Sequence, residues 1–140
     1  MSPTEQVIRL AKQADVKLSA SFNAPDVLPF ASEALEVIAK HPHLQAEFEN
    51  LFLEMPAYAP TEFIEVCMHA LRWSAVKSEY ERRCRAAVER NDWRTEPIYR
   101  HYLEAFEENW EDADDFYASY FRRGSPMPNP SFKRTPDGAA

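Results

Sequence analysis

Residues 1 to 123 contain no glycine, and both glycines of the 140-residue chain, Gly124 and Gly138, lie beyond them. Glycine supplies the positive φ angles and the close backbone approach on which phosphate-binding loops, dinucleotide-binding turns and two-residue hairpins depend. Its absence argues against P-loop enzymes, Rossmann enzymes and hairpin-rich β folds. The sequence therefore predicts an all-α fold.

Apolar residues at helical spacing divide the chain into about five helices of unequal length. We expect a first helix that begins at a capping box formed by Ser2 and Glu5 and ends within residues 16–22. We expect the others at about 23–40, 43–55, 60–90 and 96–122. The length and the 45% apolar content suit a single-domain bundle of residues 1–123. Residues 124–140, rich in proline and poor in core-forming residues, are predicted to be a disordered tail.

Residues 95 to 121 combine eight of the chain's eighteen aromatic residues with eight carboxylates. At about 100° per residue, the two sets separate on a helical wheel. The apolar stripe comprises Tyr99, Leu103, Phe106, Trp110, Ala113, Tyr117 and Tyr120. The opposite side comprises His101, Glu104, Glu108, Glu111, Asp112 and Asp115. The pattern predicts one helix with a buried aromatic face, and a break within 109–112 is the alternative because Asn and Asp favour helix caps.

Negative charge is concentrated in the same region, since residues 91–121 hold two basic and nine acidic residues, a net charge of −7. Such a field attracts basic protein surfaces and repels nucleic acids. We expect this helix to bind a basic protein partner through Glu104, Glu107, Glu108, Glu111, Asp112 and Asp115. Tyr102 and Phe116, at the edge of the stripe, are the candidate aromatic anchors. A solvated face without a binding role and a homodimer formed through exposed aromatics are the alternatives.

Residues 107–111, Glu-Glu-Asn-Trp-Glu, resemble the E-E-x-x-E motif of the all-α nucleoside triphosphate pyrophosphohydrolases. The resemblance implies that helical carboxylates near 104–115 bind Mg²⁺, which holds the substrate phosphates and activates water. The family's second motif, E-x-x-D on a following helix, is missing because no glutamate follows Glu111. This enzyme is therefore the alternative function, and we assign no catalytic residue, metal ligand or cofactor.

The histidines give no metal-ligand pattern. Glu65 and His69 are four residues apart, a spacing typical of a hydrogen-bonded pair on a helix surface. His41 and His43 flank a proline that starts a helix, so we expect them to cap a helix or to lie in solvent. His101 is expected to be a solvated, ion-paired side chain.

The basic residues between 77 and 90 do not predict a nucleic-acid site. Pairs between Glu79 and Arg83 and between Glu81 and Arg85 neutralise much of their charge, and the whole chain carries −7. No apolar run approaches the roughly 18 residues of a membrane span, and residues 1–13 lack the pattern of a signal peptide. We therefore expect a cytoplasmic protein that binds neither nucleic acid nor membrane.

Residues 128–135 resemble a peptide that recurs at the ends of unrelated bacterial reading frames that run into dispersed DNA repeats. The resemblance implies a bacterial source and a tail with no part in the fold. Small bacterial proteins that neutralise toxins, such as immunity proteins and antitoxins, often share this size and charge. That analogy rests on composition alone, and it makes such a binding role the leading expectation.

Overall fold

The computed structural model describes residues 1–121, and these residues contain helices and no strand. The eight α-helices are α1 (Pro3–Ser21), α2 (Leu28–Lys40), α3 (Gln45–Glu54), α4 (Thr61–Leu71), α5 (Ser74–Glu89), α6 (Glu96–Glu104), α7 (Glu111–Asp115) and α8 (Ala118–Phe121). Short 3₁₀ helices η1 (Ala24–Val27), η2 (Pro42–Leu44) and η3 (Met55–Ala57) lead into or out of them. The all-α prediction is confirmed, whereas the expected number of five helices is too low. The predicted tail lies outside the described residues.

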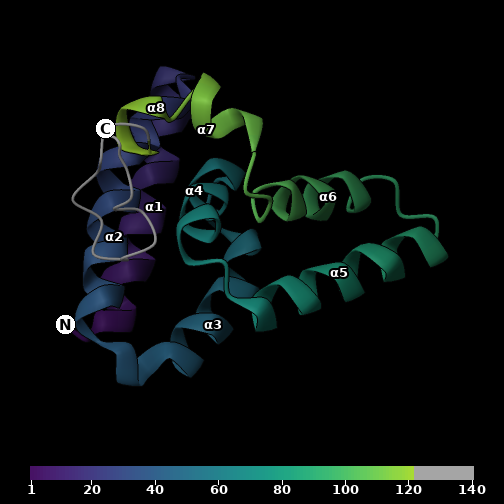
Figure 1. Ribbon diagram of the computed structural model, residues 1–140, viewed down its shortest axis with the longest axis horizontal. Coiled ribbons are helices and arrows are strands. Elements are labelled where there is room, and N and C mark those ends of the chain that lie inside the picture. The colour runs from purple at the N-terminus through teal and green to yellow at the C-terminus, as the bar shows by residue number, and fades with distance from the viewer. Residues whose placement is uncertain (122–140) are drawn as a thin grey trace.

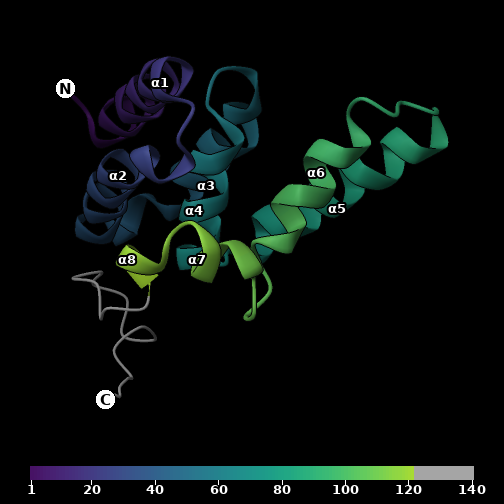
Figure 2. The ribbon, with the colours of Figure 1, turned by 90° about the horizontal axis from the view of Figure 1, so that it is seen from above.

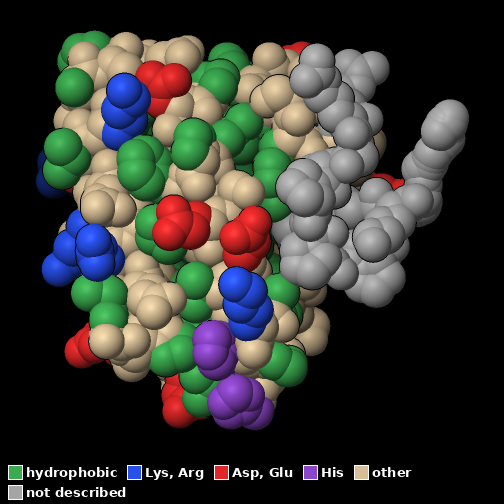
Figure 3. Space-filling model, turned by 90° about the vertical axis from the view of Figure 1, so that its left-hand side faces the viewer, with side chains coloured by type: hydrophobic (Ala, Val, Ile, Leu, Met, Phe, Trp, Pro, Cys, Tyr) green, Lys and Arg blue, Asp and Glu red, His purple; other side chains and the backbone are tan. Residues whose placement is uncertain are grey.

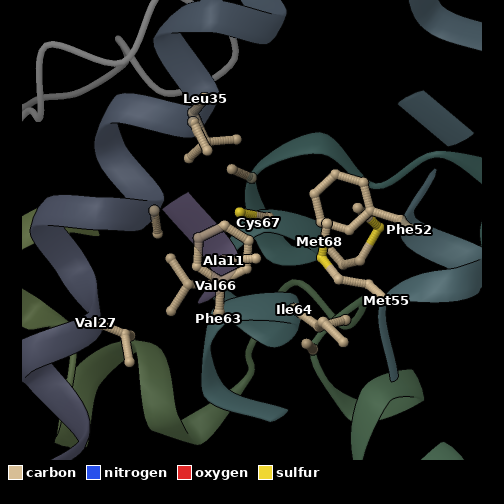
Figure 4. Packing of buried hydrophobic residues seen from close by; sticks show 14 of the residues in the cluster. Ala11, Val27, Leu35, Phe52, Met55, Phe63, Ile64, Val66, Cys67 and Met68 are labelled. Atoms are coloured by element: carbon tan, nitrogen blue, oxygen red, sulfur yellow. The ribbon is translucent and has the colours of Figure 1, made fainter. Parts of the chain in front are cut away.

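Helix α4 forms the centre of the domain. Every residue from Phe63 to Ala70 is buried, which is typical of a helix that is surrounded by other helices. Side chains from α1, η1, α2, α3 and η3 surround it (Figure 4), among them Ala11, Leu35 and Phe52. Within residues 1–121, no helix has both the length and the apolar character that crossing a membrane requires.

Helices α1 and α2 pack side by side on one flank of α4, and α5 and α6 form a hairpin on the other (Figure 1). This hairpin, which we call the α5–α6 arm, extends away from the rest of the molecule in two perpendicular views (Figures 1 and 2). It is anchored where α5 contacts α3 and where α6 contacts α4. In α5 the buried residues are Val76 and Tyr80 near its start and Ala87 further out.

The expected helix over 60–90 is wrong, because the chain breaks between α4 and α5 at Arg72. Arg72 has a φ of 48°, in the left-handed region, and its backbone N–H donates to the Met68 carbonyl at 2.7 Å. The sequence shows that the apolar face rotates between the two halves of this stretch, and the break is how the chain achieves that change of direction. No proline or glycine marks the position, so the helix end carried no local signal.

Three helices end on a residue with positive φ, a position that glycine usually fills. Phe22, Arg72 and Asn91 occupy these positions, with φ values of 55°, 48° and 58°. Of the three, only asparagine adopts this conformation readily. The chain therefore accepts local backbone strain at the ends of α1 and α4.

Candidate functional site

The predicted continuous helix over 96–122 is wrong, since α6 ends at Glu104 and a turn precedes α7. The interruption begins where the imidazole of His69 on α4 donates a hydrogen bond from Nδ1 to the Ala105 carbonyl at 2.8 Å. That carbonyl would otherwise accept from the next turn of the helix. A buried side chain of α4 therefore satisfies the end of α6 and lets the chain turn towards α7. The break starts earlier than the alternative within 109–112.

The six predicted binding carboxylates remain together in space because they fall within residues 104–115, which we call the acidic segment. Glu104 ends α6, Glu107 and Glu108 lie in the turn, and the others lie in α7. All are exposed except Asp112, which is partly buried. Residues 101–121 contain seven acidic residues and no lysine or arginine. The segment is therefore an anionic surface around a turn, and not one face of a helix.

The two predicted aromatic anchors have different environments. Tyr102 is only 2% exposed and packs against Tyr80 and Tyr99, with ring centroids 5.0 and 5.4 Å away. Its assignment as an anchor is wrong, because α4 and α5 both cover this side of α6. Phe116 follows α7 and is 48% exposed. It is a large apolar side chain that is exposed to solvent immediately after the acidic segment.

A buried carboxyl group, that of Glu65 on α4, lies beneath the acidic segment. Glu65 is only 6% exposed. Burial, together with the smaller effect of the negative charges of Asp112, Glu62 and Glu104, raises the pKa of Glu65 to about 8. Glu65 is therefore largely protonated at neutral pH. Carboxyl groups from α4, α6 and α7 thus act on one another.

His69 is buried beside Glu65 and remains uncharged. Its ring packs between those of Trp110 and Phe121, at centroid distances of 5.0 and 4.9 Å. Burial lowers the pKa of His69 to about 4, and the charge of Arg72 contributes to the lowering. The predicted surface pair of Glu65 and His69 is wrong, because both residues face the interior of the domain. The apolar residues on every side of α4 were the signal that could have placed them there.

Repulsion within the acidic segment is visible at Asp112. Partial burial raises the pKa of Asp112, and the neighbouring charges of Asp115, Glu104 and Glu111 raise it further. No lysine or arginine within residues 1–121 forms an ion pair with Glu107, Glu108, Glu111 or Asp115. The negative charges of Glu107, Glu108, Glu111 and Asp115 are therefore uncompensated by basic side chains within residues 1–121.

The arrangement differs from the one that the resemblance to the pyrophosphohydrolases implies. Glu107 and Glu108 lie in the turn while Glu111 begins α7, so the motif does not present its carboxylates from one helix. No group of three or more histidine, cysteine or acidic side chains within residues 1–121 is arranged so that it could hold a metal ion. The described carboxylates are therefore arranged as a charged surface.

The remaining histidines follow the predictions in part. His101 Nδ1 lies 3.4 Å from Glu104 Oε1 with both side chains exposed, as expected. The imidazole of His41 contacts the Val37 carbonyl at 2.9 Å and so caps α2, and the His43 ring lies beside it. Figure 3 shows two such histidine side chains at one end of the face that α1 and α2 form.

Ion pairs on α5 also match the prediction in part. Glu79 pairs with Arg83 at 2.9 Å, as expected, and with Arg82 as well. The predicted pair between Glu81 and Arg85 does not form. Arg85 is exposed and has no ion-pair partner within the described part of the chain. The α5–α6 arm therefore retains some positive charge of its own.

Comparisons were made with family models, with curated proteins and with solved structures. None of the three finds a match. The function must therefore be argued from the residues of this chain.

Proposed function

We propose that this chain is a binding protein whose acidic segment docks on the basic surface of a partner protein. The observation that carries the proposal is a set of four exposed carboxylates that form no ion pair with a lysine or arginine of the described chain, namely Glu107, Glu108, Glu111 and Asp115. A field of one sign attracts an oppositely charged surface and accelerates its association at low salt. The proposed contacts are Glu104, Glu107, Glu108, Glu111, Asp112 and Asp115.

The repulsion at Asp112 gives such binding an energetic basis. Partial burial raises the pKa of Asp112, and neighbouring carboxylates add to the effect, which means that they destabilise its ionised form. A lysine or arginine placed against the segment would reverse that effect and would lower the pKa again. Binding of a basic partner is therefore expected to release protons and to be weaker at acidic pH.

Phe116 supplies the apolar part of the proposed surface. It is about half exposed, and it follows directly after Asp115. Aromatic side chains at the centre of an interface often contribute much of its binding energy. An exposed phenylalanine beside exposed carboxylates would suit a partner that presents arginine or lysine around an apolar pocket.

The proposal extends to the setting of the protein. The net charge of −7 favours a protein partner over a nucleic acid. A cytoplasmic bacterial protein that neutralises a basic toxin, in the manner of immunity proteins and antitoxins, is the biological role that we propose from this size and charge. Homodimerisation is a separate property that sedimentation of the full chain would measure.

The test compares two triple variants that change the net charge equally. Glu107→Lys, Glu108→Lys and Glu111→Lys reverse the charge of the acidic segment. Glu33→Lys, Glu36→Lys and Glu47→Lys reverse three exposed acids on α2 and α3 instead. Proteins that the tagged wild-type chain captures from lysate are identified by mass spectrometry, and the purified partner is titrated against each variant.

We expect reversal within the acidic segment to weaken binding of a basic partner at least tenfold, and the control variant to bind much as the wild type does. Phe116→Ala should weaken the same interaction without changing its salt dependence. Equal weakening by the two triple variants would show that only total charge matters, and the assignment of the segment would then fail. Binding that is unaffected by either variant would refute the proposal.

A further inference from the structure

A second surface with the opposite chemistry lies along α1. An open groove of about 620 Å³ runs along α1, and Phe30 at the start of α2 is the one lining residue within residues 1–121 that comes from another helix. Its apolar lining is Ile8, Val16 and Phe30, and its basic lining is Arg9, Lys12 and Lys17. Figure 3 shows hydrophobic and basic side chains beside one another on the face to which α1 and α2 contribute. These residues are distinct from those of the acidic segment.

The groove follows one side of α1 for most of its length. Its lining on this helix runs from Glu5 to Lys17 and recurs once per turn. At a rise of about 1.5 Å per residue, that span is roughly 18 Å long, or about three helical turns. The core-facing side of α1, which includes Val7 and Ala14, is a different stripe. The groove is therefore a second apolar surface of a helix whose first is already packed.

The apolar lining is uncovered within the described part of the chain. Val16 is 72% exposed, although it is a large aliphatic residue in the interior of a helix. Ile8 and Phe30 are partly buried against the core and reach the surface here. An apolar groove on a helical surface commonly binds another helix, whose side chains fill the groove.

The open shape of the groove favours a helix over a small molecule as its occupant. Sites for small molecules commonly enclose 70–90% of the ligand surface, whereas this groove is open to solvent along its length. An amphipathic helix needs to bury only one face, and three turns of helix match the length of the groove.

The basic residues of the lining determine the charge of that helix. Neither Lys12 nor Lys17 forms an ion pair with any residue in 1–121, and neither does Arg9. The Lys12 ammonium lies 5.4 Å from the centre of the Tyr58 ring, and Lys12 also lines the groove. Glu5 is the one acidic residue of the lining, and its carboxylate accepts a hydrogen bond from the Ser2 N–H at the start of α1.

We propose that the groove along α1 binds an amphipathic helix of a partner protein, with acidic residues flanking the apolar face of that helix. The apolar side chains of the ligand helix contact Ile8, Val16 and Phe30. Its carboxylates lie against Arg9, Lys12 and Lys17. This partner is acidic at its contact, so it differs from the basic partner of the acidic segment, and the two sites can be tested separately.

The experiment uses the full chain and two fluorescein-labelled peptides of about 18 residues. Both carry leucines at helical i, i+3, i+4 and i+7 spacing. Glutamates flank the leucines in one peptide, and lysines replace those glutamates in the other. Fluorescence anisotropy at low salt should show that the acidic peptide binds and that its affinity falls as salt is raised. The basic peptide should bind the groove at least tenfold more weakly than the acidic peptide does.

Two matched variants locate the binding. Val16→Asp places a carboxylate in the groove at an exposed position and should weaken the acidic peptide at least tenfold. Phe22→Asp removes an even more exposed apolar residue, 87% exposed, at the end of the same helix but outside the groove lining. Aspartate tolerates the positive φ of that position, so the fold is kept and affinity should not change. Thermal unfolding of both variants confirms that they are folded.

Several results would overturn the proposal. One is that the acidic peptide does not bind, and another is that its affinity is unchanged in Val16→Asp. A third is equal affinity for the two peptides when both are measured with the Glu107→Lys, Glu108→Lys and Glu111→Lys chain, in which the acidic segment no longer attracts the basic peptide. Binding of dodecanoate that is lost in Val16→Asp, without binding of the peptide, would assign the groove to small amphiphiles instead. Sedimentation showing a dimer that Val16→Asp dissociates would assign it to a second copy of the chain.

Discussion

Glu65→Gln is expected to change how the stability of the domain depends on pH. Glutamine keeps the size and shape of the protonated glutamate but cannot ionise. In the folded chain Glu65 is buried beneath the acidic segment, where burial and the charge of Asp112 raise its pKa to about 8 from an ordinary value of 4.5. In the unfolded chain it titrates at the ordinary value. Between pH 4.5 and about pH 8, the folded state therefore retains a proton that the unfolded state has lost.

The magnitude follows from that difference. Each pH unit between the two pKa values lowers the free energy of unfolding by about 1.4 kcal/mol, because the unfolded state binds fewer protons than the folded state. The contribution of Glu65 is fully present below pH 4.5 and is lost as the pH rises towards 8. Between pH 5 and pH 8 the wild type should lose about 3–4 kcal/mol from this group, and the variant should not.

His69 acts in the opposite direction over a lower interval. Its pKa is lowered to about 4 from 6.5, so its contribution to stability is present above pH 6.5 and is lost as the pH falls towards 4. The two contributions oppose each other between pH 4.5 and 6.5 in the wild type. With Glu65 replaced, its contribution no longer opposes that of His69, so the stability of the variant should rise more steeply than that of the wild type between pH 4.5 and 6.5.

The assay is urea unfolding monitored by tryptophan fluorescence at intervals from pH 5 to pH 8. The variant minus wild-type difference in the free energy of unfolding should grow by about 3–4 kcal/mol across that range. Any cost of burying the amide is the same at each pH and cancels from this change. Glu62→Gln, on the same helix but partly exposed, is the control and should change the difference by less than about 1 kcal/mol. Parallel pH profiles for the wild type and Glu65→Gln would refute the reasoning.

Three further substitutions test the packing around this region. His69→Leu should cost about 2–4 kcal/mol in chemical unfolding at pH 7, because it leaves the Ala105 carbonyl without its buried donor; a loss below about 1 kcal/mol would mean that the turn after α6 does not depend on it. Tyr80→Phe should cost about 1 kcal/mol by the same measurement, since its hydroxyl donates to the Phe52 carbonyl at 3.3 Å, and no loss would show that water replaces the bond. Phe22→Gly should raise stability by about 0.5–1 kcal/mol by relieving a positive φ at an exposed side chain, and a destabilised variant would contradict the strain inferred there.

The sequence was sufficient for the fold class because glycine content and helical spacing both depend on local chemistry. The lack of glycine through residue 123 and the capping box at Ser2 correctly predicted an all-α fold for residues 1–121, with a first helix that starts at Pro3. The ends of α4 and α6 could not be predicted in the same way. The first depends on Arg72 adopting a conformation unfavourable to arginine, and the second on a hydrogen bond from His69, which is 36 residues away from Ala105. Both are decided by tertiary packing.

The candidate site was predicted in part for the same reason. The carboxylates predicted for the site do lie at the surface, with Asp112 partly buried, whereas the single helix face on which they were expected does not exist, and their binding role stays a prediction. Tyr102 was placed at the edge of the apolar stripe, and that stripe exists only if α6 continues without a break to residue 122. Glu65 was read as a surface residue because its four-residue spacing from His69 is common on exposed helices. Its position among apolar residues on every side of α4 was the stronger signal.

The α5–α6 arm has a consequence for the way the molecule opens. The buried side chains of Tyr80 and Tyr102 hold its inner half. In the part of α5 that follows Tyr80, Ala87 is the one buried residue. Segments with few buried apolar contacts exchange their amide hydrogens through local openings that require less free energy than global unfolding. Deuterium uptake should therefore be fast near Asn91 and should slow progressively towards Tyr80, so the outer arm would lose its structure transiently while the remainder stays folded.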